Sequence, residues 1–421
     1  MDRENFTEED KLRKENKMMK FALGGIAGLL LVALAVVLFF VVYNGVKPAE
    51  NKPTEPSAPV FEYSNYTVSD EDALAAADQV VGKIGDVELT NAELQAYYCM
   101  QIYSFIESTG GYVSYYGVDL SKPLGEQIYD ATTGKTWEEL FLEQAIGSWK
   151  RYTALRLMAE EKGYQLSADA QAEYDAMPQE MAAMAEQLGY ANVQEMVAAQ
   201  MGTGCTFEGY QRYAYTSYYC TSYFEKLYAD LTPTLDEMEA YYSEHEATFV
   251  NGGASKEKGP AVDVRHILLT PEGGTPIEGT NFSEYTEDAW EACRVKAQEI
   301  LNEYLASDRS EATFANMAAK YSSCPSAAEG GMISNALKGS TVQAFNDWIF
   351  DESRKYGDYD LVKTEFGYHI MFFVSIEDLW IRTARTTMVS ERATELIDAA
   401  MEKHTAELNM ENIKLSFIKF E

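Results

Sequence analysis

The feature that most constrains this sequence is an uncharged apolar run of 23 residues, Phe21–Tyr43. As a helix that rises about 1.5 Å per residue, the run would extend roughly 34 Å, enough to cross the ~30 Å hydrocarbon core of a bilayer. The apolar stretch of a cleaved signal peptide is shorter, about 7–15 residues, and the residues after Tyr43 (NGVKPAENKP) offer no convincing cleavage site. We therefore expect a transmembrane anchor at 21–43, in contact with the lipid bilayer, in preference to a cleaved signal.

The charges beside this run predict its orientation. Only Lys47 and Lys52 lie close on its C-terminal side. Five bases lie on its N-terminal side, namely Lys11, Arg13, Lys14, Lys17 and Lys20. Because cytoplasmic flanks carry the excess of lysine and arginine, residues 1–20 should be a cytoplasmic tail and residues 44–421 should lie outside the membrane.

The chain as a whole is acidic. Its 67 Asp and Glu against 34 Lys and Arg give a net charge of −33. Such a surface repels phosphate backbones, so we expect no nucleic-acid partner. Simple solubility explains the charge as well as any role that requires acidic groups.

The five cysteines and the remaining motifs exclude several classes of protein. The cysteines lie far apart without a CxxC pair, unlike a disulfide scaffold or a redox or zinc motif. Whether Cys205 and Cys220 pair stays open at this point. No metal-ligand spacing, phosphate loop or dinucleotide-binding glycine motif is present, so we expect neither a metal nor a cofactor.

The part beyond the apolar run divides by composition. Residues 44–78 are polar and contain four prolines, which predicts an extended tether. The stretch QVVGKIGDVELT predicts two short strands around a turn. Periodic apolar residues and caps then predict helices near 137–162, 167–188, 192–200 and 207–228, with others opened by Thr90 and Thr234. Residues 206–228 are dense in aromatics, which favours core packing over an exposed aromatic face for unfolded segments.

Residues 262–375 have a mixed α/β pattern, with apolar strands AVDVRHILL and GYHIMFFV. Two of the four histidines, His266 and His369, lie inside these strands. Either one alone is more often a core residue than a catalytic one. Between them lie YSSCPSAAEGG, a loop that ends in Gly339, AFNDWIF and GDYDLVKTEFGYHI.

This series of blocks resembles the parvulin family of peptidyl-prolyl isomerases, over about 262–375. The carrying motifs are HIL, YS-x-C-x-SA-x-x-GG, a glycine loop, F-x-x-W-x-F and VKT-x-FGYHI. The flanks are similar to extracytoplasmic foldases of the PrsA and SurA type, in which the isomerase is inserted into a helical chaperone domain. The resemblance therefore implies an α+β fold: a single transmembrane helix, a helical SurA-like chaperone domain built from N- and C-terminal segments, and an inserted parvulin α/β domain.

The expected domains follow from the composition and the resemblance together. They are the tail 1–20, the transmembrane helix 21–43, the tether 44–78, the chaperone domain with its linker helix 79–258, the isomerase 259–377 and a returning helix and strand 378–421. We expect residues 413–420 to pair with the strand near 79–84.

Position by position, the resemblance implies a site. The catalytic set would be His266, Cys324, Thr364 and His369, and the substrate-binding set would be Ile333, Thr341 and Phe345. Two departures stand out, Thr341 where the family usually has methionine and GGMIS where GGDLG is common. The stretch after the first strand, PEGGTPIEGTNFSEYTED, is acidic, so phosphoserine-proline selectivity is not expected.

The chemistry fits these residue types. Rotation about the imide bond faces a barrier of ~18–20 kcal/mol, and the twisted transition state is less polar than the planar amide, so a dry pocket favours it. The expected function is a membrane-anchored foldase, at a bacterial cell surface, acting on unfolded or partly folded exported polypeptides. The alternative is a holdase chaperone with a catalytically weak isomerase domain, which Thr341 motivates, and a cell-envelope scaffold ranks third.

Overall fold

The structure is a computed structural model that describes residues 65–109, 111–279 and 282–420. Its contacts divide the chain into two compact units. Unit 1 runs up to Leu231 and resumes at Arg392, and unit 2 comprises Thr232–Glu391. The second unit is therefore inserted in the sequence of the first.

Unit 1 is mostly helical. Before the insertion it contains β1 (Thr67–Val68), α2 (Asp70–Ala75), β2 (Val80–Ile84), β3 (Val87–Thr90), α3 (Asn91–Ser108), η1 (Val113–Tyr116), η2 (Leu124–Glu126), β4 (Ile128–Asp130), β5 (Lys135–Thr136), α4 (Trp137–Glu161), α5 (Ala168–Gln187), α6 (Val193–Met201) and α7 (Phe207–Leu231). After the insertion it contains the end of α12 (Leu379–Lys403), β12 (Ala406–Leu408), η5 (Met410–Asn412) and β13 (Leu415–Ser416).

The helix starts agree with the capping signals in the sequence. The side chains of Thr90 and Asn192 accept hydrogen bonds from the third residue of α3 and α6. Thr234 forms a complete capping box with Glu237 at the start of α8 (Leu235–Asn251). Each such cap satisfies a backbone donor that the first helical turn leaves free, so the predicted starts at these positions are confirmed.

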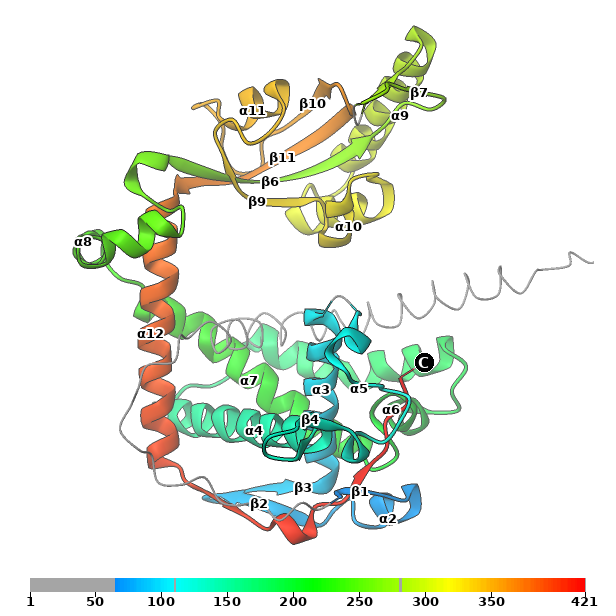
Figure 1. The fold of residues 1–421 in the computed structure, drawn as a ribbon, viewed down its shortest axis with the longest axis vertical. Coiled ribbons are helices and arrows are strands. Elements are labelled where there is room, and N and C mark those ends of the chain that lie inside the picture. The colour runs from blue at the N-terminus through cyan, green and yellow to red at the C-terminus, as the bar shows by residue number, and fades with distance from the viewer. Residues whose placement is uncertain (1–64, 110, 280–281, 421) are drawn as a thin grey trace, which may run out of the picture. The chain divides into compact units, whose positions relative to one another are not determined.

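Helix α3 is the centre of the core of unit 1. It packs against α4 and α7 (Figure 1), and residues 91–100 are buried on every side. The aromatic-rich stretch supplies α7, and four of its tyrosines are at most 4% exposed, namely Tyr210, Tyr213, Tyr219 and Tyr223. Core packing of this stretch, the favoured interpretation, is confirmed for these residues.

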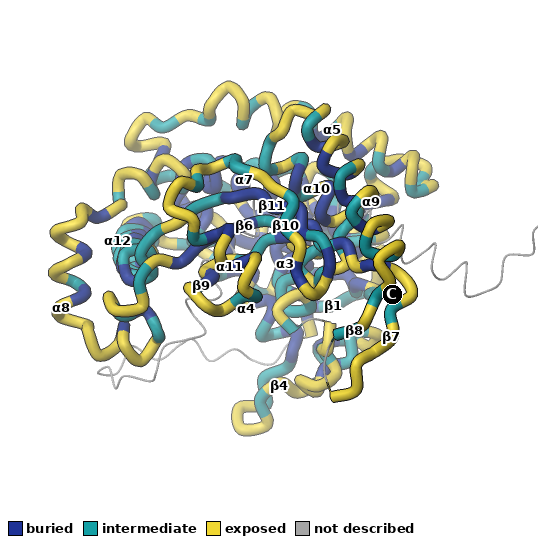
Figure 2. The backbone as a smooth tube through the Cα atoms, turned by 90° about the horizontal axis from the view of Figure 1, so that it is seen from above, coloured by how far each residue is buried: buried dark blue, intermediate teal, exposed yellow. Residues whose placement is uncertain are grey.

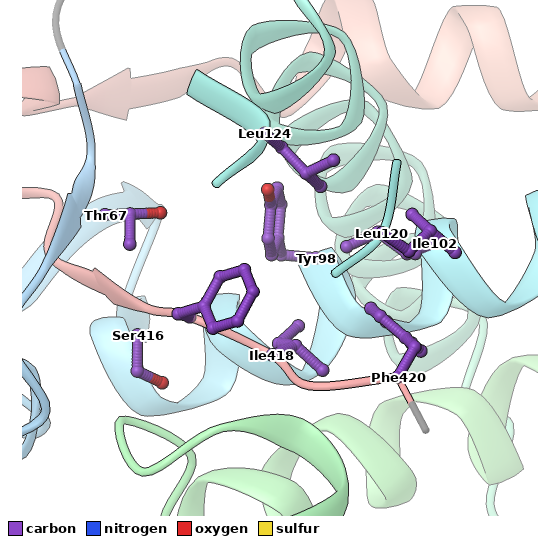
Figure 3. Close-up of a pocket in the computed structure, with 9 residues that line it drawn as sticks. Thr67, Tyr98, Ile102, Leu120, Leu124, Ser416, Ile418 and Phe420 are labelled. Carbon is purple, nitrogen blue, oxygen red and sulfur yellow. The ribbon is translucent and has the colours of Figure 1, made fainter. Parts of the chain in front are cut away.

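The C-terminal segment closes unit 1, but not with the pairing we expected. Strand β12 pairs antiparallel with β2, whereas β13 pairs parallel with β1. The prediction that 413–420 pairs with 79–84 was therefore wrong. The turn η5 lies between the two strands and moves the chain to another partner. Beyond it, Ser416, Ile418 and Phe420 line a cavity of only about 10 Å³ against α3 (Figure 3), room for no more than one water.

The expected tether also ends earlier than we predicted. Residues 67–75 form β1 and α2, and Tyr66 and Ala73 are buried. Glu138 explains the order here, because its carboxylate accepts hydrogen bonds from the backbone N–H groups of Tyr66 and Thr67, at 2.9 and 3.0 Å. The prolines and polar residues of 44–78 predict a tether, but composition gives no sign that Glu138 binds its C-terminal part. The expected tail 1–20, the membrane span 21–43 and residues 44–64 lie outside the described residues.

Unit 2 contains a four-stranded antiparallel sheet in the order β10-β11-β6-β9. Its elements are α8, η3 (Lys256–Lys258), β6 (Pro260–Leu269), β7 (Thr275–Pro276), β8 (Ser283–Glu284), α9 (Glu287–Leu305), α10 (Glu311–Tyr321), η4 (Pro325–Glu329), β9 (Met332–Leu337), α11 (Gln343–Ile349), β10 (Tyr359–Thr364), β11 (Gly367–Asp378) and the start of α12. The buried centres of β6 and β11 are dark in Figure 2.

Side-chain alternation gives this sheet two different faces. Ile267 and Phe372 pack with α9 and α10 on one face. Val264 and Met371 pack with α11 on the other. Successive residues of a strand point to opposite faces, so a residue's number decides which helices it meets.

A third cluster joins α8 to the start of α12 within unit 2. Its buried members are Met238, Tyr242, Phe249, Ala254, Trp380 and Ala384. Sequence analysis places α8 with the helical domain, whereas this packing places it in the unit that contains the sheet.

Two further findings bear on the expectations. Of the helices in the described ranges, none has the length and apolar character needed to cross a membrane. All five cysteines are free thiols, which resolves the question about Cys205 and Cys220, and only Cys324 is partly exposed.

Candidate active site

The two strand histidines lie on the same face of the sheet in unit 2. His266 is two residues from Val264 on β6, and His369 is two residues from Met371 on β11. Residues two apart on a strand share a face, so both histidines point to the face covered by α11. In the antiparallel register His266 is paired with Met371. His369 is two positions from that pair, the diagonal arrangement that brings long side chains together.

The imidazoles form the centre of a hydrogen-bonded chain. The Nδ1 atoms of His266 and His369 are 2.8 Å apart, and the rings are nearly parallel, with centroids 5.1 Å apart. Nε2 of His369 lies 2.8 Å from Thr364 Oγ1, and Nε2 of His266 lies 3.2 Å from Ser326 Oγ. One of the two Nδ1 atoms carries the shared hydrogen, so the chain from Ser326 to Thr364 can run in either direction.

Burial keeps both imidazoles neutral. It lowers the pKa of His266 to about 4. Burial, and secondarily the neighbouring His266, lowers the pKa of His369 to about 3. A neutral imidazole presents one donor and one acceptor, so near pH 7 the pair offers hydrogen bonds without a net charge.

An apolar wall lies beside the histidines. The Phe345 ring stands edge-on to both imidazoles, with centroids 5.4 Å from each. Ile333 packs against the same cluster from β9, where it is paired with Val264. Thr341 precedes α11, and its hydroxyl oxygen is buried without a hydrogen-bond partner in the described part of the chain.

The turn that carries Cys324 reaches His266 through a different residue. Cys324 is the N-cap of η4, and its backbone N–H donates to Ser322 Oγ at 3.2 Å. Its thiol makes no hydrogen bond within the described residues. Two residues on, Ser326 makes the contact with Nε2 of His266. Arg265 ties this turn to β6, because its Nη1 donates to the carbonyls of Glu329 and Gly330, each at 3.0 Å.

Two glycines permit the close approach of backbones around the pair. Gly331 has φ +72°, its carbonyl accepts from the N–H of His266, and an added Cβ would lie 2.2 Å from the carbonyl oxygen of His266. Gly367 has φ +149°, and its Cβ would lie 2.0 Å from the carbonyl oxygen of Leu269. Only glycine fits at either position.

The structure thus brings together four of the seven residues that the sequence singled out: His266, His369, Thr364 and Phe345. Ile333 joins their apolar wall, while Cys324 and Thr341 lie on the adjoining turn and loop. Sequence reasoning missed Ser326 and Arg265. The SA of the block YS-x-C-x-SA and the arginine before HIL were available signals, but nothing local indicates that either contacts the histidine pair or its turn.

Comparison with protein families gives one match. Residues 245–375 match the family model described as a PPIC-type PPIASE domain. The match covers both histidines and all of the sheet except the C-terminal end of β11, and it spans a little under a third of the chain. Among curated proteins, none matches this chain.

Solved structures give further likenesses. PrsA from Bacillus subtilis is 18% identical over 64% of this chain and 86% of its own, with a TM-score of 0.26. A structure described under two SurA-like chaperones of Campylobacter jejuni, PEB4 and Cj1289, is 18% identical over 60% of this chain and 90% of its own, with a TM-score of 0.22. TbPIN1 is 25% identical over 27% of this chain and 96% of its own, with a TM-score of 0.22. Because each TM-score is below 0.5, the assignment rests on the family match and on the geometry.

Proposed function

Residues 245–375 form a parvulin-type peptidyl-prolyl isomerase domain, and from that premise we propose that the chain is a membrane-anchored, extracytoplasmic foldase. It accelerates cis–trans isomerisation of Xaa–Pro bonds in unfolded or partly folded exported polypeptides. The observation that carries the proposal is the neutral His266–His369 pair, joined at 2.8 Å beside the buried Phe345.

Catalysis of this reaction requires no covalent step. The barrier of ~18–20 kcal/mol comes from amide resonance, which rotation removes. As resonance is lost, the imide becomes less polar and its nitrogen becomes a better hydrogen-bond acceptor. A site that replaces water with apolar surface therefore binds the twisted imide better than the planar one.

The proposed roles follow from this requirement. Phe345 and Ile333 form the apolar surface for the proline ring. His266 and His369 present uncharged donors and acceptors toward the imide, and Thr364 fixes the ring of His369. Cys324, partly exposed at the start of η4, adjusts the polarity of the substrate carbonyl's surroundings. Thr341 borders the proline-binding surface.

The rest of the proposal concerns location. Residues 21–43 anchor the chain, the tail 1–20 is cytoplasmic, and both units lie on the outer side of the membrane. Protease treatment of intact cells tests this orientation. A protected fragment that comprises the tail and the membrane span, residues 1–43, should survive, and residues 65–420 should be lost. Complete protection of these residues would contradict the orientation.

A holdase remains the second candidate, because the unpartnered buried hydroxyl of Thr341 makes the apolar surface less dry. Refolding of a secreted client with a slow proline-limited phase distinguishes the two. A foldase shortens the slow phase, and His369→Ala removes the acceleration. Suppressed light scattering with an unchanged slow phase would favour the holdase. If the chain neither shortens the slow phase nor suppresses light scattering, the cell-envelope scaffold becomes the favoured function.

A further inference from the structure

Unit 1 contains an open cleft that the isomerase chemistry does not use. Its volume is about 420 Å³, within the roughly 300–1,000 Å³ range of ligand sites. Four helices line it, contributing Glu93 from α3, Arg156 from α4, Tyr174 from α5, and Arg212, Tyr215 and Thr216 from α7. Two guanidinium groups in one cleft are notable in a chain whose net charge is −33.

The first of these arginines is held by a buried carboxyl. Arg212 donates from Nε to Glu93 Oε2 at 3.1 Å and from Nη2 to the carbonyl of Glu88 at 2.7 Å. The Glu93 side chain is only 4% exposed, whereas that of Arg212 is 40% exposed. The pairing fixes the guanidinium but leaves Nη1 of Arg212 without a hydrogen bond in the described structure.

The second arginine has an unpartnered buried donor. Arg156 donates from Nη1 to Thr216 Oγ1 at 3.1 Å, and its guanidinium lies 5.9 Å from the centre of the Tyr215 ring. Its Nε is buried and makes no hydrogen bond within the described residues. Glu160 Oε1 is 3.3 Å from this Nε, an ion-pair distance without hydrogen-bond geometry. A buried donor left in this state points to a missing acceptor.

From these contacts we infer that the cleft binds a carboxylate group through Arg156 and Arg212, beside the Tyr174 and Tyr215 rings. Guanidinium groups recognise carboxylates through paired hydrogen bonds, which are stronger than bonds between neutral groups. The carboxylate is carried either by an acidic side chain of a polypeptide or by a free organic acid. Only the polypeptide source rests on the proposed function.

The acidic residues at the rim do not reverse this preference. Asp86, in the turn between β2 and β3, and Glu88, on β3, line the cleft, and both are exposed. Exposed charges are screened by water and salt, whereas the side chain of Arg156 is only 16% exposed and is screened less. The rim acids should lower the affinity without abolishing it.

Glu93 couples the site to pH. Burial raises its pKa to about 7, against the opposing effect of Arg212 and Arg156. The charged and titratable groups that face it are Arg212, Arg156, Asp86, Glu88 and Tyr97. A bound carboxylate repels an ionised Glu93, so binding should favour its protonated form. With a pKa of about 7, the protonated fraction falls about tenfold between pH 6 and pH 8, and affinity should fall with it.

The test measures fluorescence anisotropy with the full chain in a neutral detergent. The probes are a labelled proline-free peptide with three glutamates and its counterpart with three glutamines, with succinate as competitor. At pH 6 we expect the glutamate peptide to bind at least tenfold more tightly than the glutamine peptide. Arg156→Gln and Arg212→Gln should each weaken binding by about tenfold. The control is Lys403→Gln, which removes one positive charge from an exposed ion pair with Glu161 in the same unit.

Further variants test the roles of Glu93 and Arg212. Glu93→Gln should bind equally at pH 6 and pH 8, because the titrating group is gone. If Arg212→Gln does not fold, the double variant Glu93→Gln/Arg212→Gln removes both partners and takes its place. Equal affinity for the two peptides, or arginine variants that bind as well as Lys403→Gln, would overturn the inference.

Two comparisons separate the remaining sources and hypotheses. If succinate at micromolar to millimolar concentration displaces the labelled glutamate peptide, the carboxylate comes from a free organic acid. If succinate does not displace the peptide, the carboxylate comes from a polypeptide. Proline isomerisation is measured on the same preparation. A preparation that isomerises without binding the glutamate peptide overturns this inference and leaves the proposed function standing.

Discussion

The Nδ1 atoms of His266 and His369 lie 2.8 Å apart, although 103 positions separate the two residues in the chain. Adjacent strands of one sheet bring them together, and burial makes both imidazoles neutral. The site is therefore a polar pair inside an apolar wall, and its behaviour depends on that neutrality.

The first prediction concerns pH. The folded-state pKa values of His266 and His369, about 4 and about 3, lie below the unfolded value of roughly 6.5. The unfolded chain binds more protons below pH 6.5, so the pair's contribution to stability is present above that pH and is lost as pH falls toward 4. The loss for His266 alone should be on the order of 3 kcal/mol.

Denaturant unfolding at pH 7 and pH 4.5 checks this prediction. The double variant His266→Asn/His369→Asn should lose less stability than the wild type over the same interval. Imidazole signals of both residues that titrate near pH 6.5 in the folded protein would contradict it.

The second prediction concerns Ser326 as a positioning residue. Ser326→Ala removes the 3.2 Å contact with Nε2 of His266 and leaves that nitrogen buried without its partner. A neutral hydrogen bond is worth about 0.5–1.5 kcal/mol, so kcat/KM for an Xaa–Pro peptide should fall roughly two- to tenfold.

A tautomer readout separates positioning from general damage. The ¹⁵N shift of His266 Nε2 should change in Ser326→Ala and recover in Ser326→Thr. Ser353→Ala, which removes an exposed hydroxyl bonded to Asp351, is the matched control. An unchanged ¹⁵N shift in Ser326→Ala would remove Ser326 from the chain of hydrogen bonds.

The third prediction concerns Thr341. Its buried hydroxyl has no hydrogen-bond partner among the described residues, so Thr341→Val should stabilise the protein by roughly 1 kcal/mol. Thr341→Met restores the residue usual in the resembled family and makes the neighbouring surface more apolar, so kcat/KM should rise. Thermal unfolding and peptide exchange measure the two effects. A less stable Thr341→Val would show that the hydroxyl has a partner.

The fourth prediction concerns Gly331. An alanine there would combine a positive φ with a Cβ 2.2 Å from the carbonyl of His266, so Gly331→Ala should cost about 3 kcal/mol or more and lower activity. Gly357→Ala is the control, because Gly357 has φ +85° with no atom near the added Cβ. It should cost only about 1–2 kcal/mol. Equal losses of stability in the two variants would show that the backbone moves to relieve the contact between the added Cβ and the carbonyl of His266.

Sequence reasoning succeeded where the signal is local. A helix was expected at 207–228, for example, and α7 occupies Phe207–Leu231, while α8 starts at the capping box of Thr234. The histidine pair was found because several motif blocks occur in one order, which fixes His266 and His369 to neighbouring strands.

Features that depend on residues distant in the sequence were not predicted. Residues 66–77 have the composition of a linker, yet Glu138 binds the backbone of Tyr66 and Thr67. Apolar alternation in 413–420 indicates a strand but not its partner, so β13 was assigned to β2 when it pairs with β1. Ser326 was missed for the same reason, since its role is defined by a residue 60 positions away.

Exchange NMR of an Xaa–Pro peptide with the full chain tests the central claim most directly. The wild type should interconvert the isomers far faster than the uncatalysed ~10–100 s. His266→Ala and His369→Ala should each slow exchange by at least tenfold, whereas the control His245→Ala, in the exposed part of α8, should not. Exchange by the folded wild type at the uncatalysed rate, or histidine-pair variants as active as His245→Ala, would contradict the account.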